Sequence, residues 1–388
     1  SHVTLEDDIV QTYLNQPVDL SEKYVQRKFD YISEKTSNLN STMAARMASL
    51  PNTFRKLVVK TLTTNFAEAT EVVTAQLPKP KANEVLIKNR YLGINATDIN
   101  ITAGRYHKTK ITGFVPGLEA VGEIAEVGSD VKSFLVGQPV AYQGFGCFTE
   151  YLCVSSEYAW RIPELKPEFL GFLVCGRTAL IGLDKVGRIK KGDRVLITAA
   201  AGGTGHLAVQ YAKQKKCHVV GLCSSDEKEQ LVRELGCNRV INYKKENLAD
   251  VLQEEYPNGI DVVWETVGGD VFNQCLYNLA IRGRLIVVGF ITQYKSESSY
   301  KAPGLDALPE KLLMSSASVH GFMLSHYSRE FEYYHALLLG SFELNRIKVQ
   351  LDCGEMLQTG AFKGLESIPR AVEHLHTGKS MGKVYVEI

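Results

Sequence analysis

A glycine-rich turn between an apolar segment and an amphipathic one constrains the fold of this chain more than any other feature. Residues 194–200 form a short apolar run, Gly202, Gly203 and Gly205 follow at once, and a helical pattern extends to Lys216. Glycine permits a tight turn and a close approach of the backbone, so this order predicts a strand, a turn and a helix. Parallel strands need such a crossing helix between them, and the turn therefore predicts a parallel sheet.

Strand and helix patterns go on alternating after this turn. Strand patterns are found at residues 218–223, 239–243, 260–267, 284–290 and 318–323, and helical patterns at 227–235, 247–254 and 271–279. This alternation predicts an α/β fold with a doubly wound parallel sheet of the Rossmann type over residues 171–324.

The regions on either side have a different texture. Residues 54–170 contain short strand patterns separated by glycine turns, as around the alternating segment 121–127, and predict a β-rich domain. Residues 325–388 return to mixed helix and strand. Residues 1–53 begin with a helical pattern, continue into a linker rich in Ser, Thr and Asn, and predict an N-terminal extension. This extension is either an accessory without chemistry or a helical arm that docks on a partner subunit.

Composition narrows the classes of function. The chain has 388 residues and a net charge of +1, which indicates two or three domains and gives no reason to expect nucleic acid as a partner. No apolar run approaches the ~18 residues of a membrane helix, so no membrane partner is expected. The eight cysteines include no C-x-x-C pair and indicate a reducing, intracellular environment. We expect a cytoplasmic protein and leave a mitochondrial or peroxisomal location open.

The glycine turn also predicts a binding site for a dinucleotide. Gly202, Gly203, Thr204 and Gly205 stand where a strand passes into a helix. The N-terminus of that helix offers unpaired N–H groups and a positive dipole end to a pyrophosphate. An ordinary packing turn is the alternative, but the strands and helices that follow favour the dinucleotide site.

The end of the second strand predicts which dinucleotide binds. An NAD site places Asp or Glu there to accept a hydrogen bond from the ribose 2′-hydroxyl, whereas no carboxylate ends this strand. Ser225 and Lys228 follow it, and Tyr243 ends the next strand; hydroxyl groups with a lysine suit a 2′-phosphate. Asp226 is the rival ribose ligand, but helix capping suits its position better. The sequence therefore predicts NADPH.

Several stretches together resemble the medium-chain dehydrogenase/reductase superfamily, and in particular its zinc-free quinone oxidoreductase and prostaglandin reductase branch. They are Gly93-Ile94-Asn95-Ala96-Thr97-Asp98, Ala103-Gly104-Arg105-Tyr106, Pro116-Gly117-Leu118-Glu119-Ala120-Val121-Gly122, the glycine turn at 199–205, and residues 223–228, 265–269 and 283–290. The resemblance runs from Lys56 to Ile388. It implies a GroES-like substrate domain formed by residues 54–170 and 325–388, a Rossmann domain at 171–324, and an active site between them.

The resemblance also makes absent residues informative. Zinc-dependent members carry a cysteine where this chain has Asn95 and a histidine where it has Leu118, and their third ligand position falls near Cys175. One thiolate does not make a catalytic zinc site, which needs three protein ligands. No metal is therefore expected.

Conjugate reduction is the chemistry that this set of residues suits. Without a Lewis acid to polarise a simple carbonyl, hydride from NADPH would go to the β-carbon of an α,β-unsaturated ketone or aldehyde, in a 15-oxoprostaglandin 13-reductase-like reaction. The resemblance places Asn95 near the nicotinamide ribose, and Tyr106 and Tyr294 at the substrate. Either phenol could donate to the enolate oxygen or relay a proton, and which of them does so stays open.

The remaining site residues also come from the resemblance. It places Thr178, Val267 and the backbone of Phe290 at the cofactor, whereas Phe322 and Met323 either line an apolar substrate pocket or belong to the core. The expected partners are a small molecule with an activated double bond and a second copy of the chain, in a homodimer through the Rossmann sheet edge. Two alternatives remain: a quinone or enoyl-thioester reductase, and a cofactor-binding interaction protein with little turnover.

Overall fold

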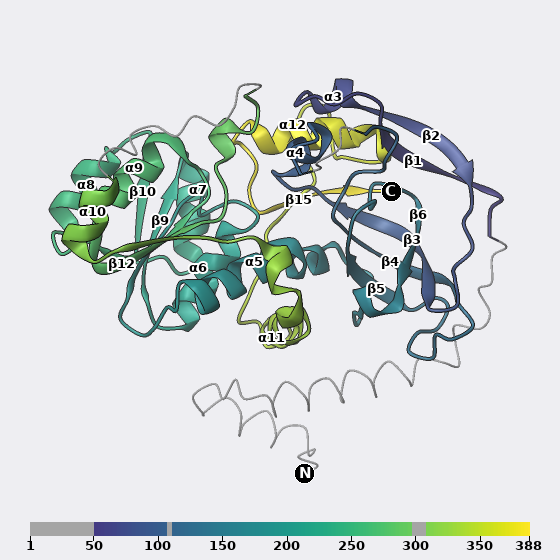
Figure 1. The fold of residues 1–388 in the computed structure, drawn as a ribbon, viewed down its shortest axis with the longest axis horizontal. Coiled ribbons are helices and arrows are strands. Elements are labelled where there is room, and N and C mark those ends of the chain that lie inside the picture. Colours follow the sequence, from purple (N-terminus) through teal and green to yellow (C-terminus); the bar gives the residue numbers. More distant parts are fainter. Residues whose placement is uncertain (1–49, 107–110, 297–307) are drawn as a thin grey trace, which may run out of the picture.

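The fold consists of two lobes joined side by side (Figure 1). The computed structural model describes residues 50–106, 111–296 and 308–388, so most of the predicted N-terminal extension lies outside the described residues. One lobe contains a six-stranded sheet and the other a seven-stranded sheet. The predicted α/β fold, with a Rossmann-type sheet and a separate β-rich part, is confirmed. No helix in the described ranges is long and apolar enough to cross a membrane.

The six-stranded sheet is parallel throughout and forms the centre of the Rossmann lobe. Its order is β10-β9-β8-β11-β12-β13, with the bounds β8 Arg194–Ile197, β9 His218–Cys223, β10 Arg239–Asn242, β11 Ile260–Glu265, β12 Leu279–Val287 and β13 Ser318–Gly321. The helices of this lobe are α6 Gly205–Gln214, α7 Asp226–Glu234, α8 Leu248–Glu255, α9 Gly269–Tyr277 and α10 Leu308–Ser315.

Alternate side chains of the central strand β8 enter two separate cores. Val195 and Ile197 pack with apolar side chains of α6, whereas Leu196 packs with those of α8 and α9. Successive side chains of a strand point to opposite faces of the sheet, so a strand that is apolar at every position must be covered on both faces.

The order of the strands reverses at β8. The chain continues from β8 to β9 and β10 on one side, and then returns to place β11 on the other side. In sheets of this kind, ligands bind outside the carboxyl ends of the strands at the point of reversal. The ends of β8 and β11 therefore position the candidate site.

The other lobe, the substrate lobe, is built around a mostly antiparallel sheet. Its order is β14-β15-β3-β4-β5-β7, with β6 also paired to β3. The bounds are β3 Glu84–Gly93, β4 Glu119–Val127, β5 Pro139–Gln143, β6 Tyr151–Ser155, β7 Ala159–Arg161, β14 Leu351–Asp352 and β15 Lys383–Glu387. Around it lie β1 Thr53–Val59, β2 Thr70–Gln76, α3 Phe66–Ala69, α4 Asp98–Thr102 and α12 Ile368–His376. Because β15 lies inside the sheet, the tail completes a lobe that the first half of the chain begins.

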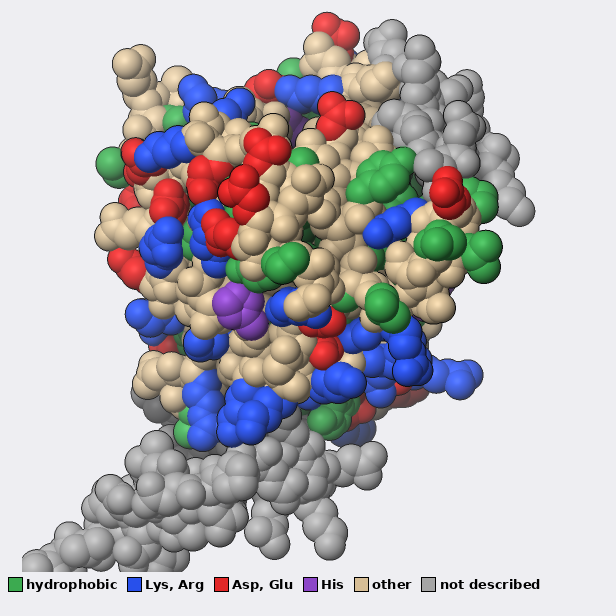
Figure 2. Space-filling view, turned by 90° about the vertical axis from the view of Figure 1, so that its left-hand side faces the viewer, with side chains coloured by type: hydrophobic (Ala, Val, Ile, Leu, Met, Phe, Trp, Pro, Cys, Tyr) green, Lys and Arg blue, Asp and Glu red, His purple; other side chains and the backbone are tan. Residues whose placement is uncertain are grey.

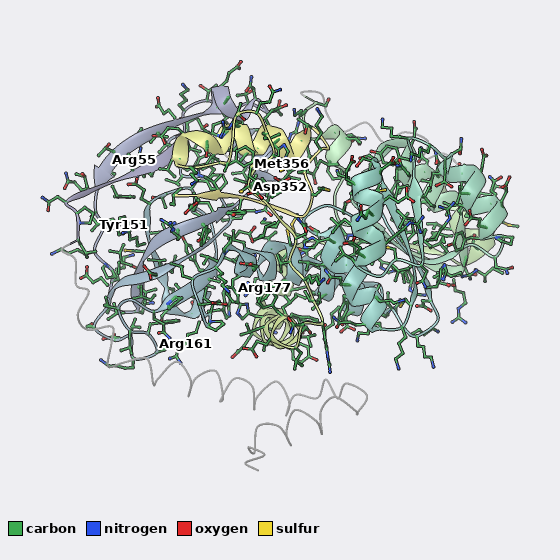
Figure 3. The ribbon with its side chains drawn as sticks, turned by 180° about the vertical axis from the view of Figure 1, so that it is seen from behind. Arg55, Tyr151, Arg161, Arg177, Asp352 and Met356 are labelled. Carbon is green, nitrogen blue, oxygen red and sulfur yellow. The ribbon has the colours of Figure 1, made fainter. Side chains whose placement is uncertain are left out.

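Two helices, α5 Val174–Ile181 and α11 Phe331–Glu343, pack against each other where the lobes meet. Arg177 of α5 is fully buried there (Figure 3). Its guanidinium lies 3.8 Å from the ring centroid of Trp160 and 4.7 Å from that of Phe331, and its Nη1 donates to Oε1 of Gln143 at 2.8 Å. Since Trp160 lies in β7 and Gln143 in β5, this stacked arginine ties the substrate sheet to both helices.

Candidate active site

The glycine turn has the tight geometry that a phosphate-binding loop requires. Ala199 adopts a positive φ of 45°, and its carbonyl oxygen accepts a hydrogen bond from the N–H of Gly202 at 2.9 Å. A Cβ at Gly205 would lie 2.2 Å from that same oxygen, so only glycine allows α6 to begin there. The N-terminus of α6 therefore opens directly beyond the end of β8, as a pyrophosphate site requires.

A buried histidine ties the glycine turn to the substrate lobe. Nε2 of His206 accepts from the N–H of Gln350 at 3.2 Å, so Nδ1 carries the proton and donates to the Gly202 carbonyl at 2.9 Å. Burial lowers the pKa of His206 to about 4, which keeps the ring neutral in this tautomer. Gly202 is therefore held from the side that faces the other lobe.

The tail of the chain passes directly beside the same turn. The N–H of Gly382 donates to the Ala201 carbonyl at 2.7 Å, and Gly382 forms a parallel bridge with Gly202. A Cβ at Gly203 would lie 3.1 Å from Sγ of Cys175. The glycine turn is thus closed in by α5 on one side and by the segment that leads into β15 on the other.

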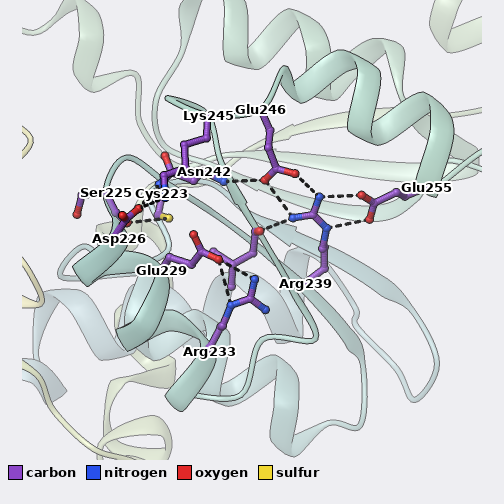
Figure 4. A network of polar contacts seen from close by, with 11 residues as sticks. Cys223, Ser225, Asp226, Glu229, Arg233, Arg239, Asn242, Lys245, Glu246 and Glu255 are labelled. Carbon is purple, nitrogen blue, oxygen red and sulfur yellow. Dashed lines mark hydrogen bonds and ion pairs between the residues drawn. The ribbon is translucent and has the colours of Figure 1, made fainter.

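Polar side chains surround the ends of β9 and β10 (Figure 4). Oγ of Ser225 accepts from the N–H of Lys228 at 3.3 Å and caps α7. The carboxylate of Asp226 pairs with Lys245 and accepts from Nδ2 of Asn242. Asp226 is therefore held toward β10, so the rival role as a ribose ligand would require it to leave these partners.

Lys228 reaches from this corner to the other lobe. Its Nζ donates to the carbonyl of Gly378 at 2.5 Å, and burial lowers its pKa. Tyr243 follows β10 and stays half-exposed, with the Lys244 ammonium 5.5 Å from its ring centroid. Ser225, Lys228 and Tyr243, the three residues predicted for a 2′-phosphate, thus follow two neighbouring strand ends.

A buried carboxylate shapes the loop at the end of β11. Glu265 accepts from the N–H groups of Val267 at 2.8 Å and Gly268 at 3.0 Å, and burial raises its pKa to about 7. Oγ1 of Thr292 donates to the Val267 carbonyl at 2.7 Å. A Cβ at Gly268 would lie 2.7 Å from Cβ of Phe290, so Phe290 lies close to the residue that follows Val267. A cofactor contact of both residues stays a prediction.

The loop after β12 is attached to the substrate lobe by an arginine. The ring of Tyr294 is buried and stands edge-on to Phe290, with the ring centroids 5.1 Å apart. Nη1 of Arg105 donates to the Tyr294 carbonyl at 2.8 Å and to Oδ1 of Asn100 at 2.7 Å. Arg105 also bonds to the carbonyl of Ser296. The segments that carry the two predicted phenols therefore meet across the junction of the lobes.

The two phenols differ in their surroundings. Tyr106 is 46% exposed, and its hydroxyl pairs with the hydroxyl of Thr97 and accepts from Nδ2 of Asn100 at 3.3 Å. The hydroxyl of Tyr294 lies 3.0 Å from the position that a Gly289 Cβ would take, so this phenol is folded against its own loop. The phenol of Tyr106 is thus open to solvent and hydrogen-bonded to Thr97 and Asn100, whereas the Tyr294 ring is buried.

Asn95 and Thr178 lie at the same junction and are both buried. Asn95 follows β3, and its side chain bonds to Glu119 and Lys383. Thr178 lies in α5 and its carbonyl accepts from the N–H of Gly182. Both positions are compatible with a cofactor laid across the ends of β8 and β11.

The structure places Phe322 in the core and Met323 near the surface. The Phe322 ring stacks on Tyr327 with the centroids 5.0 Å apart and belongs to the main buried cluster. Met323 is half-exposed. A role of this pair in lining a substrate pocket stays a prediction.

Four residues that the sequence did not single out organise this site: Arg105, Glu119, Glu265 and Lys383. Each is a charged residue at the edge of an apolar or glycine-rich segment. A charge inside such a segment is the signal that could have found them, because a buried charge needs a partner.

Comparisons with known proteins agree with this architecture. The model of the alcohol dehydrogenase GroES-like domain matches residues 81–164, and that of the zinc-binding dehydrogenase family matches residues 203–339. Prostaglandin reductase-3 of Bos taurus is 45% identical over 343 residues, which cover 88% of this chain and 91% of that protein. The chain belongs to the medium-chain dehydrogenase/reductase superfamily. The resemblance stated from the sequence is confirmed.

Other members of the superfamily are similar over comparable lengths. A probable quinone oxidoreductase of Leishmania amazonensis is 40% identical, with 88% of this chain and 99% of that protein covered. The structure of Escherichia coli quinone oxidoreductase complexed with NADPH matches with a TM-score of 0.75 at 26% identity, covering 86% of this chain and all of that chain. The assignment of this protein as a reductase is confirmed.

The residues present fit NADPH as the cofactor of such a reductase. The glycine turn leaves no space for a side chain at Gly205, no carboxylate ends β9, and the Lys228 ammonium stands within the first turn of the following helix. Among the described residues, no group of three or more His, Cys, Asp or Glu side chains is placed to hold a metal ion.

Proposed function

We propose that this reductase adds hydride from NADPH to the β-carbon of an α,β-unsaturated ketone or aldehyde. The observation that carries the proposal is the Tyr106 phenol, a neutral donor next to Arg105 at the junction of the lobes, whose hydroxyl is linked to Thr97 and Asn100. Neutral donors suit the negative charge that develops on the carbonyl oxygen during conjugate reduction. Similarity to prostaglandin reductase-3 over most of both chains supports the same reaction.

The Rossmann lobe would hold NADPH along the ends of its central strands, and the bound cofactor supplies the hydride. Gly202, Gly203, Thr204 and Gly205 would face the pyrophosphate, because their backbone forms the N-terminal approach to α6. The segment that leads into β15 covers the other side of this turn, because Gly382 bridges to Gly202.

The two ends of the cofactor would be distinguished by charge. At the adenosine end, Ser225, Lys228 and Tyr243 offer a cation and two hydroxyl groups to a 2′-phosphate. At the nicotinamide end, Thr178 and the loop segments of Val267 and Phe290 offer mainly backbone groups and apolar surface. The cation would raise affinity for NADPH over NADH, since only NADPH carries the 2′-phosphate.

Tyr106 is the phenol that we assign to the enolate. Its hydroxyl is linked to Thr97 and Asn100 and lies near solvent, so a proton given to the substrate could be replaced from water. Tyr294 would instead support the nicotinamide pocket through its packing on Phe290.

Two conservative variants test this assignment. Tyr106→Phe should lower kcat by about 100-fold, because the hydroxyl is lost while the ring stays, whereas Tyr294→Phe should lower it by less than about tenfold. Tyr277→Phe, an exposed tyrosine on α9, is the matched control. A larger loss with Tyr294→Phe than with Tyr106→Phe would reverse the assignment.

Oxidation of NADPH, followed by the absorbance of the reduced nicotinamide, tests the reaction itself. The panel contains an α,β-unsaturated ketone, the matching saturated ketone, a quinone and an enoyl thioester. The expected result is turnover of the unsaturated ketone and none of the saturated one. Turnover of the quinone alone would replace the proposal with quinone reduction, which similarity to the Leishmania amazonensis and Escherichia coli proteins favours as the second candidate. If NADPH binds but is oxidised with none of these compounds, the result would indicate an interaction protein.

We further propose a homodimer that forms through the free edge of the Rossmann sheet. Strand β13 ends the sheet, the exposed apolar side chains of Ile281, Leu313 and Met314 belong to β12 and to α10, which packs on it, and hydrophobic side chains reach the surface at this end of the molecule (Figure 2). Sedimentation equilibrium should give twice the chain mass, and Leu313→Asp with Met314→Asp should shift it to the monomer. A wild-type monomer at micromolar concentration would overturn this arrangement.

The eight thiols support a cytoplasmic location, because none of them forms a disulfide and most are buried. Fractionation of cells that make the untagged protein should place it with cytosolic markers. Recovery in mitochondria or peroxisomes would contradict this part of the proposal.

A further inference from the structure

A buried ion pair surrounds the Asn95 side chain. Oδ1 of Asn95 accepts from Nζ of Lys383 at 2.9 Å, and its Nδ2 donates to Oε1 of Glu119 at 2.9 Å. Lys383 and Glu119 also pair with each other, and both side chains are at most 1% exposed. The side chains of Asn95, Lys383 and Glu119 therefore contact one another pairwise and form a closed ring of polar contacts.

This ring fixes which way the amide points. A rotation that exchanged Oδ1 and Nδ2 would place the NH₂ group against an ammonium and the carbonyl against a carboxylate. Burial lowers the pKa of Lys383, but the neighbouring Cys175 and Glu119 raise it by more, so the amine stays protonated. The electrostatic pattern thus selects a single orientation of the Asn95 side chain.

One donor of the amide is left over by these contacts. Nδ2 has two hydrogens; one goes to Glu119, and no acceptor among the described residues takes the other. The backbone of Asn95 is fixed as well, since its N–H donates to Oδ2 of Asp98 at 2.8 Å. A fixed N–H that no described residue accepts is what a ligand-binding group presents.

The ring lies beside the glycine turn. Residue Lys383 follows Gly382, which bridges to Gly202, and the Cα of Lys383 lies 3.8 Å from the position that a Gly203 Cβ would take. The second oxygen of Glu119 accepts from the N–H of Val174 at 2.7 Å, at the start of α5. The starts of β4, β15 and α5 therefore meet at this ion pair, beside the glycine turn.

Stability alone gives little reason to bury these charges. Removing two charges from water costs several kcal/mol per ion, so a buried pair is often no better than apolar side chains of the same volume. The Asn95 orientation, by contrast, depends on both charges. The ion pair is therefore suited to fixing the orientation of the Asn95 amide.

We propose that Lys383 and Glu119 are positioning residues that hold the Asn95 amide with one N–H directed at the nicotinamide ribose of NADPH. The inference rests on the proposed function and on the resemblance to medium-chain reductases, which places Asn95 near that ribose. Without the ion pair, the amide would rotate between two orientations, and only one of them would offer the donor.

Equilibrium binding of NADPH in a double-mutant cycle tests the inference. The variants are Asn95→Ala, the charge-neutral pair Lys383→Met with Glu119→Gln, and the combination of all three. Loss of one hydrogen bond should weaken NADPH about fivefold in Asn95→Ala. The neutral pair should weaken it by a similar factor, and in the Asn95→Ala background it should have no further effect. Binding is followed by the fluorescence of the bound cofactor, so no substrate is needed.

A matched pair elsewhere in the chain controls for general loss of stability. Arg284 and Asp193 form another largely buried pair, with Nη2 of Arg284 2.9 Å from Oδ2 of Asp193. Arg284→Met with Asp193→Asn should lower the melting temperature and leave NADPH affinity unchanged.

Three results would overturn the inference: additive losses in the cycle, unchanged NADPH affinity in the neutral pair while Asn95→Ala binds more weakly, and unchanged affinity in Asn95→Ala. Failure of enone turnover with normal NADPH binding would bear on the proposed reaction alone.

Discussion

Replacement of Lys228 by alanine tests the coenzyme assignment through the ratio of the dissociation constants of NADPH and NADH. The Lys228 ammonium is half-buried at the start of α7, where a 2′-phosphate would receive a charge-assisted hydrogen bond. Such a bond is worth about 1.5–3 kcal/mol, or about 10- to 150-fold in affinity. Lys228→Ala also removes the bond to the Gly378 carbonyl, but that loss enters the dissociation constants of NADPH and NADH equally. The ratio of the two constants should therefore change by about 10- to 150-fold.

Titration of the purified protein with each coenzyme, followed by coenzyme fluorescence, measures both constants. Lys191→Ala, an exposed lysine before β8, is the control and should leave both constants unchanged. Equal weakening of NADPH and NADH in Lys228→Ala would refute the reasoning, because the lysine would then act only as a tie to the substrate lobe.

Three further substitutions have defined outcomes. Gly205→Ala should lower the free energy of unfolding by about 1–3 kcal/mol in urea denaturation, because the new Cβ would lie 2.2 Å from the Ala199 carbonyl oxygen; an unchanged midpoint would mean that the turn can open. Burial raises the pKa of Asp98 to about 7, so the wild-type carboxyl adds stability that is fully present below its unfolded pKa and lost as the pH rises through 7. Asp98→Asn should therefore gain up to about 4 kcal/mol relative to the wild type between acidic and mildly alkaline pH, and a pH-independent difference would contradict this. Arg177→Lys should lower stability by about 2 kcal/mol, the value of a desolvated stack on Trp160, and a thermal melt that matches the wild type would argue against that stack.

Local sequence decided the strands and the turn of the Rossmann lobe. The predicted strand at 218–223 coincides with β9, and Ser225 caps the helix that was expected after it. The strand predicted at 284–290 begins earlier, at Leu279. A turn-like pair lies within it: Arg282 adopts a positive φ of 63° beside Gly283, and the pairing with β11 shifts register there. A bulge of this kind looks like a loop in the sequence, because it uses the same residues.

The partners inside the site could not be predicted in the same way. Lys383 begins the last strand and Glu119 begins an alternating strand, and a charge at either place is usually solvated. Only the pairing of β15 with β3, and of β3 with β4, buries both beside Asn95. The direction of the Tyr294 phenol depends likewise on how its loop folds. Residue types at the site follow from local patterns, whereas contacts between distant segments require the fold.

Because β15 lies inside its sheet, the substrate lobe can be completed only after the Rossmann lobe during synthesis on the ribosome. All six strands of the Rossmann sheet have been made once Gly321 is added, and that lobe can then begin to fold. The end of β3 pairs with residues of β15, so the Tyr91–Gly93 backbone is an unpaired edge until residues 383–387 have been synthesised. A nascent chain halted shortly before Lys383 would therefore carry a complete nucleotide-binding sheet together with an unpaired strand edge, which another chain or a chaperone could bind.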